Sequence, residues 1–136
     1  MNRAIELHDS VLAILENVPG AIRVLFEPAY VHETEGVPGV DPGIGWWQTI
    51  ELFVNAGSVQ GRLTALSSEV SDGSLTADGR EYGNLVPLPI SFTGEVKLDL
   101  RLKTGESVLI RGSAIRSGFE GRPEDPEEFP GCSRLH

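Results

Sequence analysis

Cysteine is almost absent from this 136-residue chain, which contains only Cys132. One cysteine cannot form a disulfide within the chain, so we expect a fold without disulfides and a cytoplasmic location. No apolar run approaches the roughly 20 residues that a membrane-spanning helix requires. The first six residues, Met1 to Glu6, include an acid and lack the apolar stretch of a secretory signal. We therefore expect no membrane partner.

Positive charge is also scarce, with 11 Lys and Arg against 20 Asp and Glu, for a formal net charge of −9. A protein that binds nucleic acid usually presents a basic face to the phosphates. We therefore expect no nucleic-acid partner. A basic protein is compatible with this charge, because opposite fields accelerate association. The charge is equally explained by solubility alone.

Sequence fingerprints of catalysis are missing as well. The chain has no Gly-x-Ser-x-Gly elbow, no phosphate-binding loop and no Rossmann glycine pattern. Cys132 follows an acidic stretch, which disfavours the thiolate form that a nucleophile needs. These absences favour a protein without enzymatic activity, although the sequence leaves that question open.

Glycine and proline, in contrast, are plentiful, with 16 and 9 residues. This composition is typical of short strands joined by tight turns. The clearest strand signal is the alternation in residues 94–103, which places Val96, Leu98, Leu100 and Leu102 on one face and charged side chains on the other. Residues 104–106 read as a turn and residues 107–111 as the returning strand, so we predict a hairpin with one buried face.

The N-terminal segment, residues 5–16, also favours a strand. A short helix is the alternative, because Asp9 and Ser10 are good helix caps. A turn at Pro19-Gly20 followed by a strand over residues 21–27 favours a hairpin instead.

The register of this hairpin follows from its apolar positions. Because paired residues lie on the same face, we predict Leu12 opposite Phe26 and Ile14 opposite Val24. Extended outward, the same register places His8 opposite Tyr30 and close to His32. Pro28 cannot donate a ladder hydrogen bond, which indicates an edge or a bulge at that position.

The fold class follows from strands and turns that alternate along the whole chain. We predict a single all-β domain over residues 1–117, an antiparallel, jelly-roll-like β-sandwich of about eight short strands, with an open β-barrel as the alternative. Residues 33–45, which contain two Pro-Gly steps, form the longest expected loop. Residues 118–136 are acidic and rich in proline, and we expect a loosely ordered C-terminal tail there.

Four short phrases resemble those of small, uncharacterised bacterial proteins. They are Ile5 to Ser10, Pro28 to His32, Asp72 to Thr76 and Gly105 to Ser113. The Leu-His-Asp-Ser opening is also similar to that of some proposed immunity proteins of bacterial toxin systems. The resemblance implies a bacterial, cytoplasmic β domain and favours an immunity role, and it brings no catalytic residues with it.

Two histidines and a carboxylate form the first candidate site. If the predicted register holds, His8, Asp9 and His32 lie close together, with Tyr30 and Glu33 beside them. Such a group can hold zinc or another divalent metal, or it can transfer protons near neutral pH. The alternative is that both histidines are structural, while Asp9 and Ser10 make turn or cap hydrogen bonds.

A second candidate site surrounds the adjacent tryptophans. Neighbouring side chains on a strand face opposite ways, so at least one of Trp46 and Trp47 is expected to be poorly buried. An exposed tryptophan beside carboxylates can anchor a protein partner or stack on a sugar. The alternative is that one ring fills the core and the other covers the glycine-rich loop. The predicted binding residues are Tyr30, His32, Glu33, Glu35, Asp41, Trp46 and Trp47.

Three functional hypotheses follow. The first is a non-enzymatic binding domain, such as an immunity-type inhibitor of a basic protein. The second is a small metal-binding protein or metal-assisted enzyme that uses His8, Asp9 and His32. The third is a homo-oligomer that assembles through the edges of its sheets.

Overall fold

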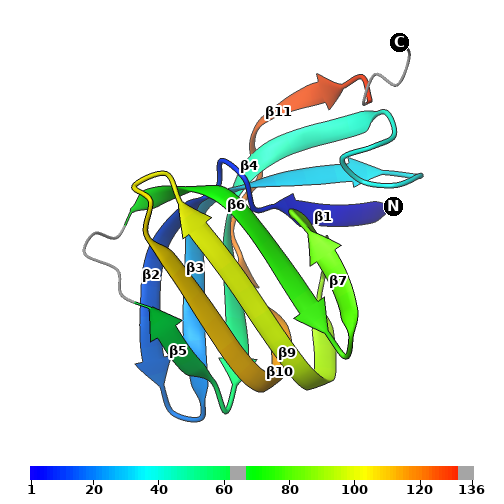
Figure 1. Cartoon of the computed structure of the whole chain (residues 1–136). Coiled ribbons are helices and arrows are strands. Elements are labelled where there is room, and N and C mark those ends of the chain that lie inside the picture. Colours follow the sequence, from blue (N-terminus) through cyan, green and yellow to red (C-terminus); the bar gives the residue numbers. More distant parts are fainter. Residues whose placement is uncertain (62–66, 132–136) are drawn as a thin grey trace.

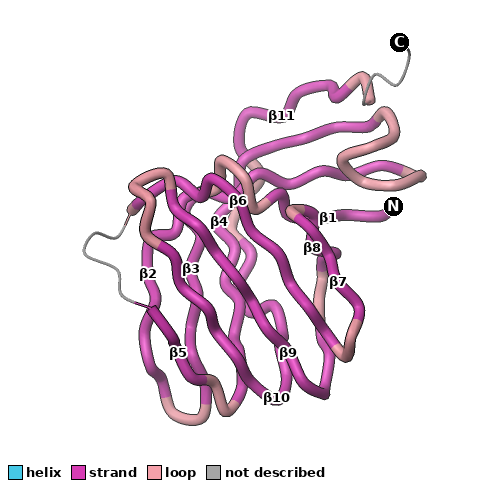
Figure 2. Tube along the Cα trace, viewed as in Figure 1, coloured by secondary structure: helices cyan, strands magenta, loops and turns pink. Residues whose placement is uncertain are grey.

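The fold is built entirely from antiparallel strands. The structure is a computed structural model, and it describes residues 1–61 and 67–131. These residues form eleven strands and no helix (Figure 2). The prediction of an antiparallel all-β protein is therefore confirmed. Within the described ranges, no helix has the length and apolar character needed to cross a membrane.

Six strands close into a barrel. Their order around the ring is β3, β4, β10, β9, β6 and β2, and β2 returns to β3. The strands are β2 (Val11–Val18), β3 (Ala21–Thr34), β4 (Gly43–Asn55), β6 (Ser68–Ala77), β9 (Ser91–Leu102) and β10 (Ser107–Glu120). Closure gives each of these strands a partner on both sides and removes the free edges of an open sheet.

Five further strands attach to this ring. β1 (Asn2–Glu6) pairs with β3 and with β8 (Leu85–Leu88), and β11 (Glu124–Phe129) pairs with β4. β5 (Ser58–Gly61) pairs with β10, and β7 (Arg80–Gly83) pairs with β6. The structure therefore differs from the expected eight-stranded sandwich. It is nearer to the open-barrel alternative, but the ring is closed.

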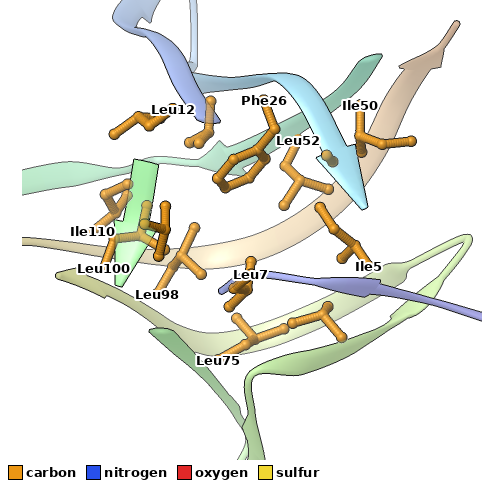
Figure 3. Close-up of a cluster of buried hydrophobic side chains, with 14 of the residues drawn as sticks. Ile5, Leu7, Leu12, Phe26, Ile50, Leu52, Leu75, Leu98, Leu100 and Ile110 are labelled. Carbon is orange, nitrogen blue, oxygen red and sulfur yellow. The ribbon is translucent and has the colours of Figure 1, made fainter. Parts of the chain in front are cut away.

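The barrel interior holds the hydrophobic core. Val96, Leu98, Leu100 and Leu102 all point inward with 1% exposure or less, as the alternation in β9 predicts. Figure 3 shows Phe26 of β3 and Leu98 of β9 among the buried side chains that meet there from opposite sides of the ring. The turn at Gly105, which has a φ of +94°, joins β9 to β10 as expected.

The predicted N-terminal hairpin is confirmed with one shift of register. Residues 5–16 contain no helix, and the two strands β1 and β2 are separated by residues 7–10. Leu12 pairs with Phe26 as predicted, but the pairing of Ile14 with Val24 is wrong. A bulge between Leu12 and Ile14 places Leu15 opposite Val24 instead. Alternation of apolar residues does not reveal such an insertion.

The outer part of the predicted register also changes. Glu6, rather than His8, pairs with Tyr30, because β1 is a separate strand along the distal half of β3. The bulge that Pro28 predicts is present, since the pairing of β3 with β4 shifts between Phe26 and Ala29. Beyond this bulge the two strands leave the barrel together.

An extension, here called the arm, projects from one end of the barrel (Figure 1). It consists of residues 1–6, 28–48 and 120–131. The distal parts of β3 and β4 form its centre, from the pair Ala29–Gln48 to the pair Glu33–Ile44. β1 lies beside β3, and β11 lies beside β4. The arm is therefore a four-stranded continuation of the barrel wall.

The arm corrects two predictions. Residues 118–120 complete β10 and residues 124–129 form β11, so the loosely ordered tail is wrong for the described part of 118–136. Residues 132–136, including Cys132, lie outside the described residues. The expected loop over 33–45 is shorter than predicted and spans residues 35–42, because its two ends pair with β1, β11 and each other. Proline and glycine content alone does not reveal these partner strands.

The barrel core generates the first testable prediction. Leu98→Ala should lower the free energy of unfolding by roughly 2–5 kcal/mol, because it leaves a cavity between packed walls. Lys97→Ala, on the outer face of the same strand, should change it by about 0.5 kcal/mol or less. Urea unfolding followed by circular dichroism measures both values. Equal losses in the two variants would contradict the inward placement of Leu98.

Candidate functional site

A row of four rings crosses one face of the arm. The ring centroids of Trp47 and Tyr30 are 4.8 Å apart, those of Tyr30 and His32 are 5.0 Å apart, and those of His32 and Phe129 are 4.9 Å apart. All three contacts are edge-to-face, the geometry that the charge distribution of aromatic rings favours. Because the rings come from β4, β3 and β11, the row fastens the C-terminal strand to the rest of the arm.

The register of the arm explains this row. Tyr30 pairs with Trp47, His32 pairs with Gly45, and Phe129 pairs with Gly43, so all four rings fall on one face. Gly45 leaves the space that the Tyr30 ring occupies. A Cβ atom on Gly45 would lie 2.3 Å from the hydroxyl oxygen of Tyr30 and 2.7 Å from its Cζ. Glycine at position 45 is therefore required by the close approach of Tyr30.

Two carboxylates bind the polar atoms of these rings. The Tyr30 hydroxyl donates a hydrogen bond of 2.6 Å to Oε1 of Glu127. Burial, reinforced by this carboxylate, raises the pKa of Tyr30, so the hydroxyl remains a donor at neutral pH. His32 Nε2 lies 3.2 Å from Oε1 of Glu6. The His32 side chain is almost fully buried, at 3% exposure, and its Nδ1 has no hydrogen-bond partner among the described residues.

The adjacent tryptophans face opposite ways. Trp46 belongs to the hydrophobic core cluster, with 6% exposure, and its Nε1 donates to Oε1 of Gln48. Gln48 Nε2 in turn donates to the carbonyl of Gly121. Trp47 is half-buried on the aromatic face. Trp46 is thus a structural residue at the base of the arm, and Trp47 is the tryptophan that a partner can reach.

The structure divides the seven predicted binding residues among several places. Tyr30, His32 and Trp47 come together in the ring row. Glu33 lies on the opposite face of the arm, because it is offset by one residue from His32. Glu35 and Asp41 lie in the loop over residues 35–42, where Asp41 Oδ2 accepts a hydrogen bond from the backbone of Val37.

Three residues of the aromatic face were not predicted from the sequence. Phe129 and Glu127 belong to the segment that was expected to be a loose tail, and Glu6 was read only as part of a strand. The spacing of Glu127 and Phe129 does place both on one face of a strand. Proline and acidic residues are both rare in strands, so Pro126 and its acidic neighbours argue against a strand in this segment.

The Leu-His-Asp-Ser phrase forms the junction between β1 and β2. Leu7 is fully buried in the core, and its backbone N–H donates to the carbonyl of Asn84. Asn84 Oδ1 accepts the backbone N–H of His8 at 2.6 Å. Ser10 is buried, and its hydroxyl donates to the carbonyl of Glu6 while accepting the N–H of Tyr30. This phrase therefore has a structural explanation, as a fastening between the barrel and the arm.

A group of potential metal ligands lies at the same junction. Glu6, His8 and Asp9 each offer one ligand atom, and these atoms lie within 4.8 Å of one another. His8 Nδ1 is 3.1 Å from Asp9 Oδ2, and Lys103 Nζ is 3.0 Å from Asp9 Oδ1. His32 is not in this group but contacts it through Glu6. Of the predicted trio His8, Asp9 and His32, the structure thus groups two, with Glu6 as the third ligand.

Negative charge is concentrated on the arm. The arm contains nine carboxylates and two guanidiniums, Arg3 and Arg122, so it holds a formal charge of −7 out of the total of −9. The remaining residues contain eleven carboxylates and nine Lys and Arg, and they are close to neutral. The arm carboxylates are Glu6, Glu33, Glu35, Asp41, Glu120, Glu124, Asp125, Glu127 and Glu128. Arg3 is already paired with Glu120, at 3.0 Å.

Comparisons with protein-family models, with curated proteins and with solved structures give no significant match to this chain. The geometry and charge of the arm are therefore the only guide to its function.

The aromatic face generates the second prediction. Gly45→Ala should displace Tyr30 and lower the free energy of unfolding by about 1–3 kcal/mol, because the added methyl overlaps the ring. Gly83→Ala is a matched control, since no atom lies within 4 Å of its added Cβ. Urea unfolding monitored by tryptophan fluorescence measures both. Equal stability of the two variants would contradict the placement of Tyr30 over Gly45.

Proposed function

We propose that this protein is a non-enzymatic binding domain whose arm recognises a basic surface of another protein. The observation that supports the proposal is the separation of charge, with −7 on the arm and −2 on the rest of the chain. If solubility alone accounted for the charge, it would not need to gather at one end. A field concentrated on one extension steers and orients an oppositely charged partner.

The exposure of these groups fits the proposal. Glu124, Asp125, Glu127 and Glu128 of β11 are all exposed, and so is Glu35 in the neighbouring loop. Trp47 adds a partly exposed aromatic ring, the type of side chain that often anchors protein interfaces. An acidic rim beside an aromatic anchor is well suited to a partner that presents arginine or lysine.

In its most specific form, the proposal is an immunity-type inhibitor that blocks a basic protein in the bacterial cytoplasm. The resemblance of the Leu-His-Asp-Ser phrase to proposed immunity proteins favours this form. No catalytic chemistry is needed for it, because an inhibitor acts by covering its target. We expect coexpression with a toxic basic protein from a neighbouring gene to restore growth of the host cell.

Assembly through sheet edges is less well supported than binding through the arm. The sheet path ends at β11 and at β8, which contain Pro126 and Pro87. Proline has no N–H to donate to an added strand, and acidic side chains on β11 repel a second copy. Both features are typical of edges that are protected from pairing.

A charge-reversal experiment tests the proposed role of the arm. We expect Glu35→Lys with Glu124→Lys to weaken the binding of a hexa-arginine peptide by roughly tenfold at low salt, because the attracting field is reduced. The control variant carries Glu81→Lys and Glu95→Lys, two exposed sites outside the arm, and should bind almost as the wild type does. Isothermal titration calorimetry gives both affinities. Equal weakening in the two variants would show that only total charge matters and would refute the proposal.

A metal-binding function is the second candidate, and the group Glu6, His8 and Asp9 supports it. One imidazole and two carboxylates form an acceptable ligand set for zinc. The ion pair of Asp9 with Lys103 competes with a metal for the same carboxylate. This candidate therefore ranks below binding through the arm.

Zinc titration tests the second candidate. If the group binds a metal, the wild type takes up one zinc ion per chain, and His8→Ala abolishes this uptake because it removes the imidazole ligand. Asp72→Asn, an exposed carboxylate on β6, is the control and should leave the uptake unchanged. Calorimetry and elemental analysis measure the stoichiometry. Absence of zinc uptake by the wild type would exclude this function.

A further inference from the structure

A pocket of about 470 Å³ lies at the tip of the arm. The side chains that line it are apolar except for the two carboxylates of Glu33 and Glu128. The other lining residues are Met1, Pro42, Gly43, Ile44, Phe129 and Pro130. The pocket therefore combines an apolar lining with negative charge.

The register of three strands builds the charged rim of this pocket. Ile44 on β4 pairs with Glu33 on β3 and also with Glu128 on β11. Opposite residues in antiparallel strands share a face, so the two carboxylates flank the isoleucine directly. Ile44 is 38% exposed, which is unusual for a large apolar side chain in this structure. This small patch can therefore contact an apolar group through Ile44 and a positively charged group through the two carboxylates.

Neither carboxylate of the rim is engaged within the described structure. The side chains of Glu33 and Glu128 make no hydrogen bond or ion pair with another described residue. Arg3 on β1 lies opposite Glu33 in the ladder between β1 and β3. The Arg3 side chain, however, binds Glu120 at 3.0 Å. The negative charge of the pocket is thus available to a partner.

From this arrangement we propose that the pocket receives an arginine side chain of the basic partner. The methylene stem would lie on Ile44 and the apolar lining, while the guanidinium would meet Glu33 and Glu128. A planar guanidinium suits this site because it donates from several N–H groups and packs its faces on apolar surface. A lysine ammonium is a compact, strongly hydrated charge, so its contact with the apolar lining is less favourable. This inference deepens the proposed function and depends on it.

The experiment uses a probe as small as the pocket, N-acetyl-arginine amide, titrated into the ¹⁵N-labelled full chain. We expect amide shifts centred on Glu33, Ile44 and Glu128. N-acetyl-citrulline amide has nearly the same shape without the charge and should produce no such shifts. N-acetyl-lysine amide should bind roughly threefold or more weakly than the arginine probe. Equal shifts from the citrulline probe, or equal affinity of the lysine probe, would overturn the assignment to arginine.

A matched pair of variants separates the pocket from the arm. Glu33→Gln with Glu128→Gln removes the two rim charges and should weaken the arginine probe roughly tenfold. Glu124→Gln with Asp125→Asn removes two arm charges outside the pocket and should leave the probe affinity within about twofold of the wild type. Thermal unfolding checks that both variants remain folded. Equal weakening in both variants would refute arginine binding in the pocket but would leave the proposed role of the arm intact. Equal weakening of hexa-arginine binding in the arm and control variants of the earlier experiment would refute the proposed function itself.

Discussion

The pairing of β3 with β4 is the interaction on which the rest of the structure depends. Its proximal part, from Ala21–Asn55 to Phe26–Ile50, belongs to the barrel wall, and its distal part, from Ala29–Gln48 to Glu33–Ile44, forms the centre of the arm. The bulge near Pro28 lies between the two parts and marks the point where the pair leaves the barrel. One continuous ladder therefore supports both a packed core and a projecting surface, and a displacement of this ladder would disturb both.

The two parts of the molecule have different chemistry. The barrel is closed, filled mostly with aliphatic side chains and nearly balanced in charge. The arm is held by rings instead of a full core, and it carries most of the net charge. The carboxylate of Glu127 has a structural role and a surface role. It accepts a hydrogen bond from the Tyr30 hydroxyl, and it contributes to the exposed acidic surface of the arm. This division is the basis for our proposal that the arm, rather than the barrel, binds a partner.

The sequence predicted an antiparallel all-β fold and several of the strands in the barrel wall, but not the closed ring, and little of the arm. Strict alternation revealed the inward face of β9, and the Pro19-Gly20 turn revealed the hairpin of β2 and β3. Alternation cannot reveal the bulge after Leu12, nor can it show that the ring closes, since closure depends on pairing between strands far apart in the chain. The aromatic row was missed in part because Phe129 lies in an acidic segment with proline, a composition typical of loose tails. That segment becomes a strand because β4 offers it a free edge and because Gly45 leaves room for the Tyr30 ring.

Order in the arm is the central requirement of this account, because acidic residues on a loose tail would not form a defined binding surface. Residue-resolved amide hydrogen exchange of the wild-type protein tests it most directly. The account predicts slowed exchange in β11 and in the distal halves of β3 and β4, with the slowest exchange in the barrel strands. Exchange of residues 124–129 at the rate of an unstructured peptide, beside a protected barrel, would contradict it.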